Sequence, residues 1–137
     1  MSTLNTLLLK SIKKYSNKVF YKSLDDASQV LFKDILSLTY PWLLFFKEKN
    51  IQKGDCIAFT LDLSESNIGL LLTIFCFGYV GVPLYPETTQ STCDYIINET
   101  KAKFLIFDFQ FWIAGHPRLK EVYQVYAVDL RPPELYP

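Results

Sequence analysis

The single histidine and the adjacent pair of carboxylates are the first candidates for acid–base chemistry. His116 is the only histidine in the chain, and Gly115 and Pro117 on either side of it predict a turn. A catalytic triad needs a nucleophile, a base and an orienting group held together, so we interpret His116 as a turn residue. Asp25 and Asp26 also lie in a predicted turn, whereas acid–base catalysis needs two carboxylates in different environments. We therefore assign no catalytic role to His116 or to the aspartate pair.

The three cysteines, Cys56, Cys76 and Cys93, do not match a metal-binding pattern. Zinc sites use three or four ligands at recognisable spacing, and three dispersed cysteines with one histidine do not provide it. Cys56 opens a strand-like run and Cys76 lies in an apolar segment, so we expect buried free thiols. Free thiols are typical of a reducing compartment, and the first residues do not resemble a secretion signal. We predict a cytoplasmic protein and assign no metal ligand.

The glycine content argues against a complete nucleotide site. Phosphate loops use clustered glycines because backbone N–H groups must approach the pyrophosphate closely. The chain has five glycines, and the closest pair, Gly78 and Gly81, lies among apolar residues. Neither GxGxxG nor GxxxxGK followed by Ser or Thr occurs. We therefore assign no cofactor-binding residue in this chain.

Charge and aromatic content favour an ordinary folded domain over a nucleic-acid binder. Fourteen basic and fourteen acidic residues cancel, so no net field attracts nucleic acid or an anionic membrane. The densest basic group is interpreted as a solvated helix face: Lys10, Lys13, Lys14 and Lys18. An aromatic group without a basic groove around it is assigned to core or interface packing, not to base stacking: Phe104, Phe107, Phe109, Phe111 and Trp112.

The first half of the chain predicts a helix, a β-hairpin and a second helix. Leucines recur at helical spacing between Thr3 and Tyr15, with lysines on the opposite side. Val19–Tyr21 and Gln29–Ile35 are typical of strands and are expected to pair across a turn. The second helix is predicted to begin with Thr39 as N-cap and Pro41 in its first turn, and to run to Lys49, where Asn50 ends it.

The second half predicts alternating buried strands and helices. Short apolar runs indicate strands over residues 56–61 and 103–107, with an extended segment over 82–86 and a last strand over 123–128. An apolar helix capped by Ser64 and a helix over residues 92–100, with Tyr95, Ile96 and Ile97 facing inward, connect them. This order predicts an α/β fold with a partly parallel sheet, flanking helices and the N-terminal β-hairpin.

One apolar segment could be mistaken for a membrane span. Ile68 to Val82 is apolar almost throughout, but it is shorter than the ~20 residues needed to cross a bilayer, and Pro83 follows at once. A helix that is hydrophobic all round can also be buried between the layers of a globular fold. We predict a buried helix here and no transmembrane segment.

Three stretches, in order, resemble the beginning of the adenylate-forming superfamily of acyl-CoA synthetases, fatty acyl-AMP ligases and adenylation domains. The first is Leu38-Thr39-Tyr40 followed by a helix and by the segment Asn50 to Ala58. The second is Asn67 to Pro86, which ends in a Val-Pro-Leu-Tyr-Pro sequence, and the third is Tyr95 to Ile106. The resemblance extends over about Leu4 to Asp108, and residues 109–137 match less clearly.

The resemblance implies that residues 1–137 form a single N-terminal subdomain of a larger enzyme. In that family the phosphate loop, the ribose-binding Asp and the catalytic Lys lie beyond the matching region, so no functional residue is carried over. The parent enzyme would use ATP and Mg²⁺ to convert a carboxylic acid to an acyl-AMP and then transfer the acyl group to a thiol. Tyr85-Pro86 is more similar to the ending in long-chain acyl-CoA synthetases than to that in amino-acid adenylation domains, and this resemblance favours a fatty acid.

Two expectations about partners follow. As part of such an enzyme, the chain is expected to be inactive alone and to pack against the remainder of its parent. It is also expected to expose an apolar face, formed by residues 104–112 and the C-terminal Tyr-Pro pair. Such a face favours homo-oligomers. The alternative hypothesis is a stand-alone truncated relative that acts as an interaction or regulatory module.

Overall fold

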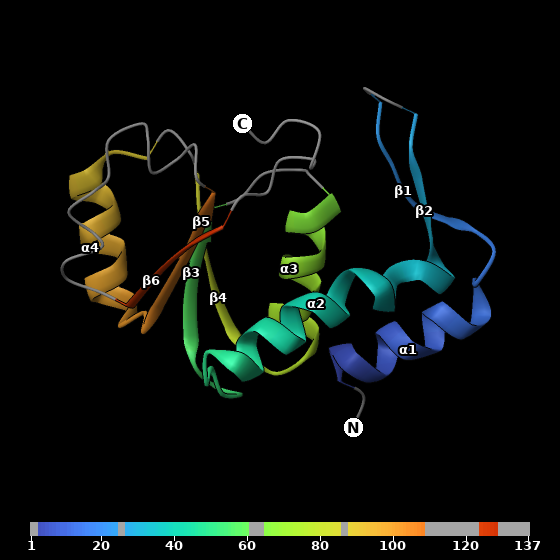
Figure 1. Cartoon of the computed structure of the whole chain (residues 1–137), viewed down its shortest axis with the longest axis horizontal. Helices are drawn as coiled ribbons and strands as arrows, with labels where there is room; N and C mark the ends of the chain where they lie inside the picture. Colours follow the sequence, from blue (N-terminus) through green and yellow to red (C-terminus); the bar gives the residue numbers. More distant parts are fainter. Residues whose placement is uncertain (1–2, 25–26, 61–64, 86–87, 109–123, 129–137) are drawn as a thin grey trace.

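The computed structural model describes residues 3–24, 27–60, 65–85, 88–108 and 124–128. These residues form helices and strands that alternate through most of the chain (Figure 1). The elements in chain order are α1 (Leu4–Lys14), β1 (Val19–Lys22), β2 (Gln29–Leu31), the 3-10 turn η1 (Phe32–Asp34), α2 (Ile35–Glu48), β3 (Cys56–Thr60), α3 (Glu65–Cys76), β4 (Val80–Leu84), α4 (Gln90–Thr100), β5 (Phe104–Asp108) and β6 (Gln124–Val128).

A four-stranded parallel sheet forms the centre of the molecule. Its strand order is β4-β3-β5-β6, and every neighbouring pair is parallel. Helices cover both faces, with α2 and α3 on one side and α4 on the other (Figure 1). The predicted α/β class is therefore confirmed, including the last strand, β6, which lies within one residue of its expected position.

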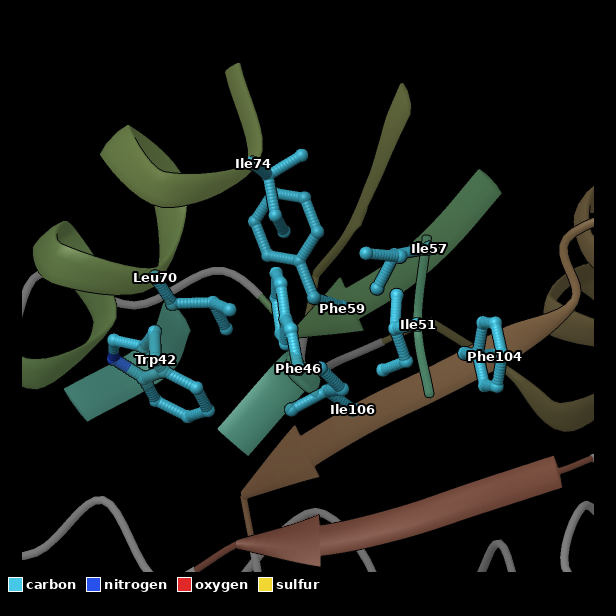
Figure 2. Packing of buried hydrophobic residues seen from close by; sticks show 9 residues of the cluster. All are labelled: Trp42, Phe46, Ile51, Ile57, Phe59, Leu70, Ile74, Phe104 and Ile106. Carbon is cyan, nitrogen blue, oxygen red and sulfur yellow. The ribbon is translucent and has the colours of Figure 1, made fainter. Parts of the chain in front are cut away.

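The larger core lies between the sheet and the layer of α2 and α3. Side chains from β3 and β5 that point to this face meet aromatic and aliphatic side chains from the two helices (Figure 2). The buried members are Trp42, Phe46, Ile51, Ile57, Phe59, Leu70, Ile74, Phe104 and Ile106. Because successive strand residues point to opposite faces, the intervening residues of β3 and β5 are left for the other side.

The smaller core lies between the sheet and α4. Ala58 of β3 and Leu105 of β5 point to this face, where Cys93 and Ile97 of α4 cover them. Cys93 and Ile97 are four residues apart and thus share one face of the helix. Tyr95, which we expected to face inward, is exposed because it lies half a turn away from that stripe. The helix also begins two residues earlier than predicted, with Thr89 as its N-cap.

Helix α1 contacts η1 and α3, and the hairpin extends from the start of α2 (Figure 1). Thr3 caps α1 by accepting a hydrogen bond from the Thr6 amide at 3.1 Å, and the helix spans nearly the predicted residues. Strands β1 and β2 pair antiparallel, which confirms the hairpin. The turn residues Asp25 and Asp26 lie outside the described residues.

The predicted boundary between the second strand and the second helix is wrong. The strand ends at Leu31, and α2 begins at Ile35 after one 3-10 turn, so Pro41 lies inside the helix. Thr39 is no N-cap; its hydroxyl donates to the Leu36 carbonyl at 3.2 Å within the helix. Burial of Ile35 stabilises the early start by about 1.5–3 kcal/mol, which is comparable with the ~3 kcal/mol cost of an interior proline.

The long apolar segment divides into a helix and a strand. Helix α3 ends at Cys76, Gly78 adopts a φ of +93°, and β4 begins at Val80. The predicted helix therefore ends at Cys76, because the left-handed glycine turns the chain before Val82; Leu70 and Ile74 of this helix are buried, whereas Phe75 is 40% exposed. No helix among the described ranges is long and apolar enough to cross a membrane. Ser64, the predicted N-cap, lies outside those ranges.

Candidate functional site

The carboxyl edge of the parallel sheet is the candidate functional site. All four strands run in the same direction, so their carboxyl ends lie along one edge. In open parallel α/β sheets, ligands bind outside this edge. Within the described residues the edge is formed by the last residues of the strands: Thr60, Leu84, Asp108 and Val128. The residues that follow each strand are described only in part, over 65–85 and 88–103.

The strand order locates the point on this edge where ligands are expected. The chain leaves β3 through α3 and enters β4 on one side; from β4 it crosses back through α4 and enters β5 on the other side of β3. The order reverses between β3 and β5, where Phe59 and Ile106 are paired. In open α/β sheets, ligands bind outside the carboxyl ends of the strands at such a reversal of the order. The candidate site thus lies beyond Thr60 and Asp108.

Two buried polar residues support this edge. Thr60 ends β3, and Asn67 lies in the first turn of α3, which follows β3; both side chains are buried. Both take part in interactions within the fold, as buried polar groups usually do. An uncharged hydroxyl and an uncharged amide can orient the connections that leave the sheet, but neither is a base or a nucleophile without further activation. Sequence reasoning did not single them out, although Thr60 interrupts an apolar run and Asn67 directly precedes one.

The cysteine side chains are unsuited to thiolate chemistry. All three are free; Cys93 is buried, whereas Cys56 and Cys76 are only half-buried, which corrects the expectation of buried thiols for those two. Burial raises the pKa of each thiol above its ordinary value, and the charge of Asp94 adds to the rise at Cys93. A raised pKa keeps a thiol protonated, while nucleophiles and metal ligands are thiolates. Among the described residues no group of three or more potential ligands could hold a metal ion.

The remaining candidates from the sequence do not meet at the edge. His116, Asp25 and Asp26 lie outside the described residues, as do Phe109, Phe111 and Trp112. Phe104 is buried in the larger core, so it does not belong to an exposed aromatic face. The basic residues Lys10, Lys13, Lys14 and Lys18 are exposed along or just after α1.

A shallow groove of about 460 Å³ lies near the opposite, amino edge of the sheet. It is lined by residues from the end of α2, the turn before β3 and the turn before β4: Leu43, Lys47, Asn50, Ile51, Gln52, Lys53 and Tyr79. Burial, together with the nearby charge of Asp55, raises the pKa of the Tyr79 phenol. The phenol therefore stays neutral at physiological pH. This groove lies at the amino ends of the strands, whereas parallel sheets bind ligands at the carboxyl ends.

The fold is similar to solved structures of adenylate-forming enzymes. Coronafacic acid ligase from Pectobacterium brasiliense matches with a TM-score of 0.81 and 18% identity over 98% of this chain and 27% of the ligase. Klebsiella oxytoca NpsA, solved with 3-hydroxyanthranilyl-AMSN, matches with a TM-score of 0.75 and 14% identity over 93% of this chain and 25% of NpsA. The O-succinylbenzoate coenzyme A synthetase MenE from Bacillus subtilis, solved with AMP, matches with a TM-score of 0.76 and 15% identity over 90% of this chain and 30% of MenE.

These similarities establish the fold. The chain has the fold of an N-terminal portion of adenylate-forming enzymes, and it spans between about a quarter and a third of the length of the solved enzymes it matches. No protein-family model and no curated protein matches the sequence.

Proposed function

We propose that this chain is the N-terminal scaffold of an enzyme that activates a carboxylic acid as an acyl adenylate and then transfers the acyl group to a thiol. The supporting observation is the sheet order β4-β3-β5-β6 with its flanking helices, which matches adenylate-forming enzymes over 90–98% of the chain. A likeness that covers nearly every element of this chain favours a shared role for the whole segment. That role is to support the carboxyl edge of the sheet.

ATP and Mg²⁺ belong to the proposed parent reaction, and the described residues do not fit them. A triphosphate needs clustered backbone N–H groups or cationic side chains aimed at its oxygens. At the described carboxyl edge the buried polar side chains are Thr60 and Asn67, which are uncharged and engaged within the fold. We therefore assign no catalytic step to these residues, and residues 1–137 are expected to be inactive alone.

For the acid itself we propose a fatty acid. The proposal rests on Tyr85-Pro86, the pair that resembles the long-chain synthetases. Tyr85 follows β4 at the carboxyl edge and its side chain is exposed, so its ring is available at the edge where a substrate would bind. The matched enzymes are named for other acids, among them coronafacic acid and O-succinylbenzoate. Aromatic and small acids are therefore the comparison set.

An ATP–pyrophosphate exchange assay tests the proposal. The protein encoded by the complete reading frame is incubated with ATP, Mg²⁺, labelled pyrophosphate and a panel of fatty, aromatic and amino acids. We expect acid-dependent exchange, fastest with a fatty acid, and none from residues 1–137. If exchange is fastest with an aromatic acid, the proposal of a fatty acid is refuted, while the proposal of acyl-adenylate formation stands.

The same assay separates the enzyme from the alternative, an interaction module. Absence of exchange with every acid would contradict the proposed activity. A reading frame that stops directly after Pro137, together with a partner protein recovered on pull-down, would favour the interaction module.

A further inference from the structure

Helix α2 carries an apolar line on the side that faces away from the core. Its buried side is formed by Ile35, Thr39, Trp42 and Phe46. On the outer side, Leu36, Tyr40 and Leu44 are 42%, 61% and 49% exposed. These three residues are spaced four apart, so they lie one above another along the helix. We call them the α2 outer stripe.

The outer stripe differs from the solvent face of a surface helix. A surface helix normally places charged and polar residues opposite its buried side. The residues of α2 from Ile35 to Phe46 include no charged side chain, and charges appear only at Lys47 and Glu48. A helix that is apolar on all sides is typical of an element packed between two layers. One of those layers is the described core, and the other is absent from the described residues beside the stripe.

The size of the stripe favours a segment of the same polypeptide over a second copy. Three side chains spaced over two turns extend along roughly 12 Å of helix. A stable dimer interface buries about 1,200–2,000 Å², which is far more than three half-exposed side chains provide. A segment of the same chain needs less contact area, because it does not lose the freedom of a separate molecule on binding. The matched enzymes are three to four times longer than the part this chain covers, as the 25–30% coverage indicates.

We propose that the α2 outer stripe is the surface on which a later, apolar segment of the same enzyme packs. The inference rests on the proposed function, since it takes the chain as part of a longer enzyme. The stripe is a different surface from the apolar face expected at residues 104–112, of which Phe104 is buried in the larger core and residues 109–112 lie outside the described residues. The partner is an amphipathic helix or strand whose apolar side lies along Leu36, Tyr40 and Leu44.

Site-specific photocrosslinking in the protein of the complete reading frame tests the proposal. Tyr40→p-benzoylphenylalanine keeps the first aromatic ring and extends it by a benzoyl group, which the 61% exposure of Tyr40 can accommodate and which places the reactive ketone on the stripe. The matched control is Tyr95→p-benzoylphenylalanine on α4, because Tyr95 is 66% exposed and lies on the other face of the sheet. After irradiation, we expect adducts at position 40 that join it to peptides following residue 137 in a product of monomer mass. Their yield should exceed that at position 95 at least fivefold.

Three outcomes would overturn the proposal: crosslinks between two copies, a yield at position 40 no higher than at position 95, or a reading frame without residues after Pro137. Leu44→p-benzoylphenylalanine repeats the measurement one turn along the stripe if the first variant does not fold. Exchange activity of the unsubstituted protein is measured in parallel. Adducts without exchange support the docking surface and refute the proposed activity. Exchange without adducts supports the proposed activity and refutes the docking surface.

Discussion

Three residues in a left-handed backbone conformation end the helices that precede β3, β4 and β5. They are Asn50 (φ 58°), Gly78 (φ 93°) and Lys101 (φ 55°). In each case the amide of the next residue donates to the carbonyl five positions back: Ile51 to Phe46 at 2.8 Å, Tyr79 to Ile74 at 3.1 Å and Ala102 to Ile97 at 3.1 Å. This is the Schellman arrangement. Glycine and asparagine tolerate it well, whereas lysine does not.

We expect Lys101→Gly to stabilise the protein. Glycine removes the clash between Cβ and the backbone at φ 55°, and the gain is partly offset by the greater freedom of glycine in the unfolded chain. The net increase in the free energy of unfolding should be about 0.5–1 kcal/mol, measured by urea denaturation. Lys101→Ala is the control, since it removes the side chain and keeps the strained Cβ. Equal stability of the two variants would show that the backbone strain is not relieved.

These residues also show what the sequence reveals at single positions. Asn50 and the Lys53-Gly54-Asp55 turn could be predicted, because Asn and Gly are the types that adopt positive φ. Lys101 could not, since lysine carries no such signal and its conformation is imposed by the packing of α4 on β5. The buried side chains of Thr60 and Asn67 were likewise invisible, because their burial depends on which strands become neighbours.

At the scale of elements, the crossing of α2 over α3 depends on one glycine. A Cβ built on Gly69 would lie 2.5 Å from the Leu38 carbonyl oxygen of α2, so the two backbones touch here. The Thr73 hydroxyl lies in the same contact and is 2.7 Å from the Gly69 carbonyl and 3.4 Å from the Thr39 carbonyl. The close crossing brings Trp42 and Phe46 onto Leu70 and Ile74 in the larger core.

Gly69→Ala should destabilise the protein although alanine is the better helix former. The added methyl group meets a backbone atom that cannot rotate away, and such overpacking costs about 1–3 kcal/mol. Helix propensity returns only ~1 kcal/mol. We expect a net loss of about 1 kcal/mol, with an upper limit of about 2 kcal/mol, in thermal or urea unfolding. Ser37→Ala on the exposed side of α2 is the control and should change stability little; a Gly69→Ala variant as stable as this control would mean that the helices separate without cost.

Three strands of the parallel sheet were predictable, whereas the start of α2 and the end of α3 were not, for a physical reason. Buried parallel strands are continuous apolar runs, so β3, β5 and β6 lie within one or two residues of their predicted positions. The start of α2 was placed at Thr39 because Thr and Pro are local start signals. The helix begins earlier because Ile35 is buried by packing against residues distant in the sequence. Residue types near the helix start carry no information about that packing. For the same reason the sequence identified no site residue, because the carboxyl edge of the sheet is defined only once the strands have taken their order.

For the molecule as a whole, buried and half-buried groups that lose protons at high pH set an alkaline limit to stability. Burial raises the pKa of Cys56, Cys76 and Cys93 above their ordinary value of 9.0. Burial and the charge of Asp55 raise the pKa of Tyr79 above 10.0. In the unfolded chain these groups ionise at their ordinary values. Above about pH 9 the unfolded state therefore binds fewer protons than the folded state, and the free energy of unfolding falls as pH rises.

We accordingly expect the urea midpoint to be unaffected by these groups between pH 7 and 8, where both states are protonated, and to decrease from about pH 9 as the thiols of the unfolded chain ionise. Cys93→Ala identifies the main contributor, since Cys93 is fully buried and faces Ala58, Leu84 and Leu105. The variant loses stability at pH 7 because the sulfur leaves a small cavity, but its decline above pH 9 should be shallower. A decline as steep as in the unsubstituted protein would mean that the pKa of Cys93 in the folded state is not raised above its ordinary value. It would follow that water reaches this thiol in the smaller core.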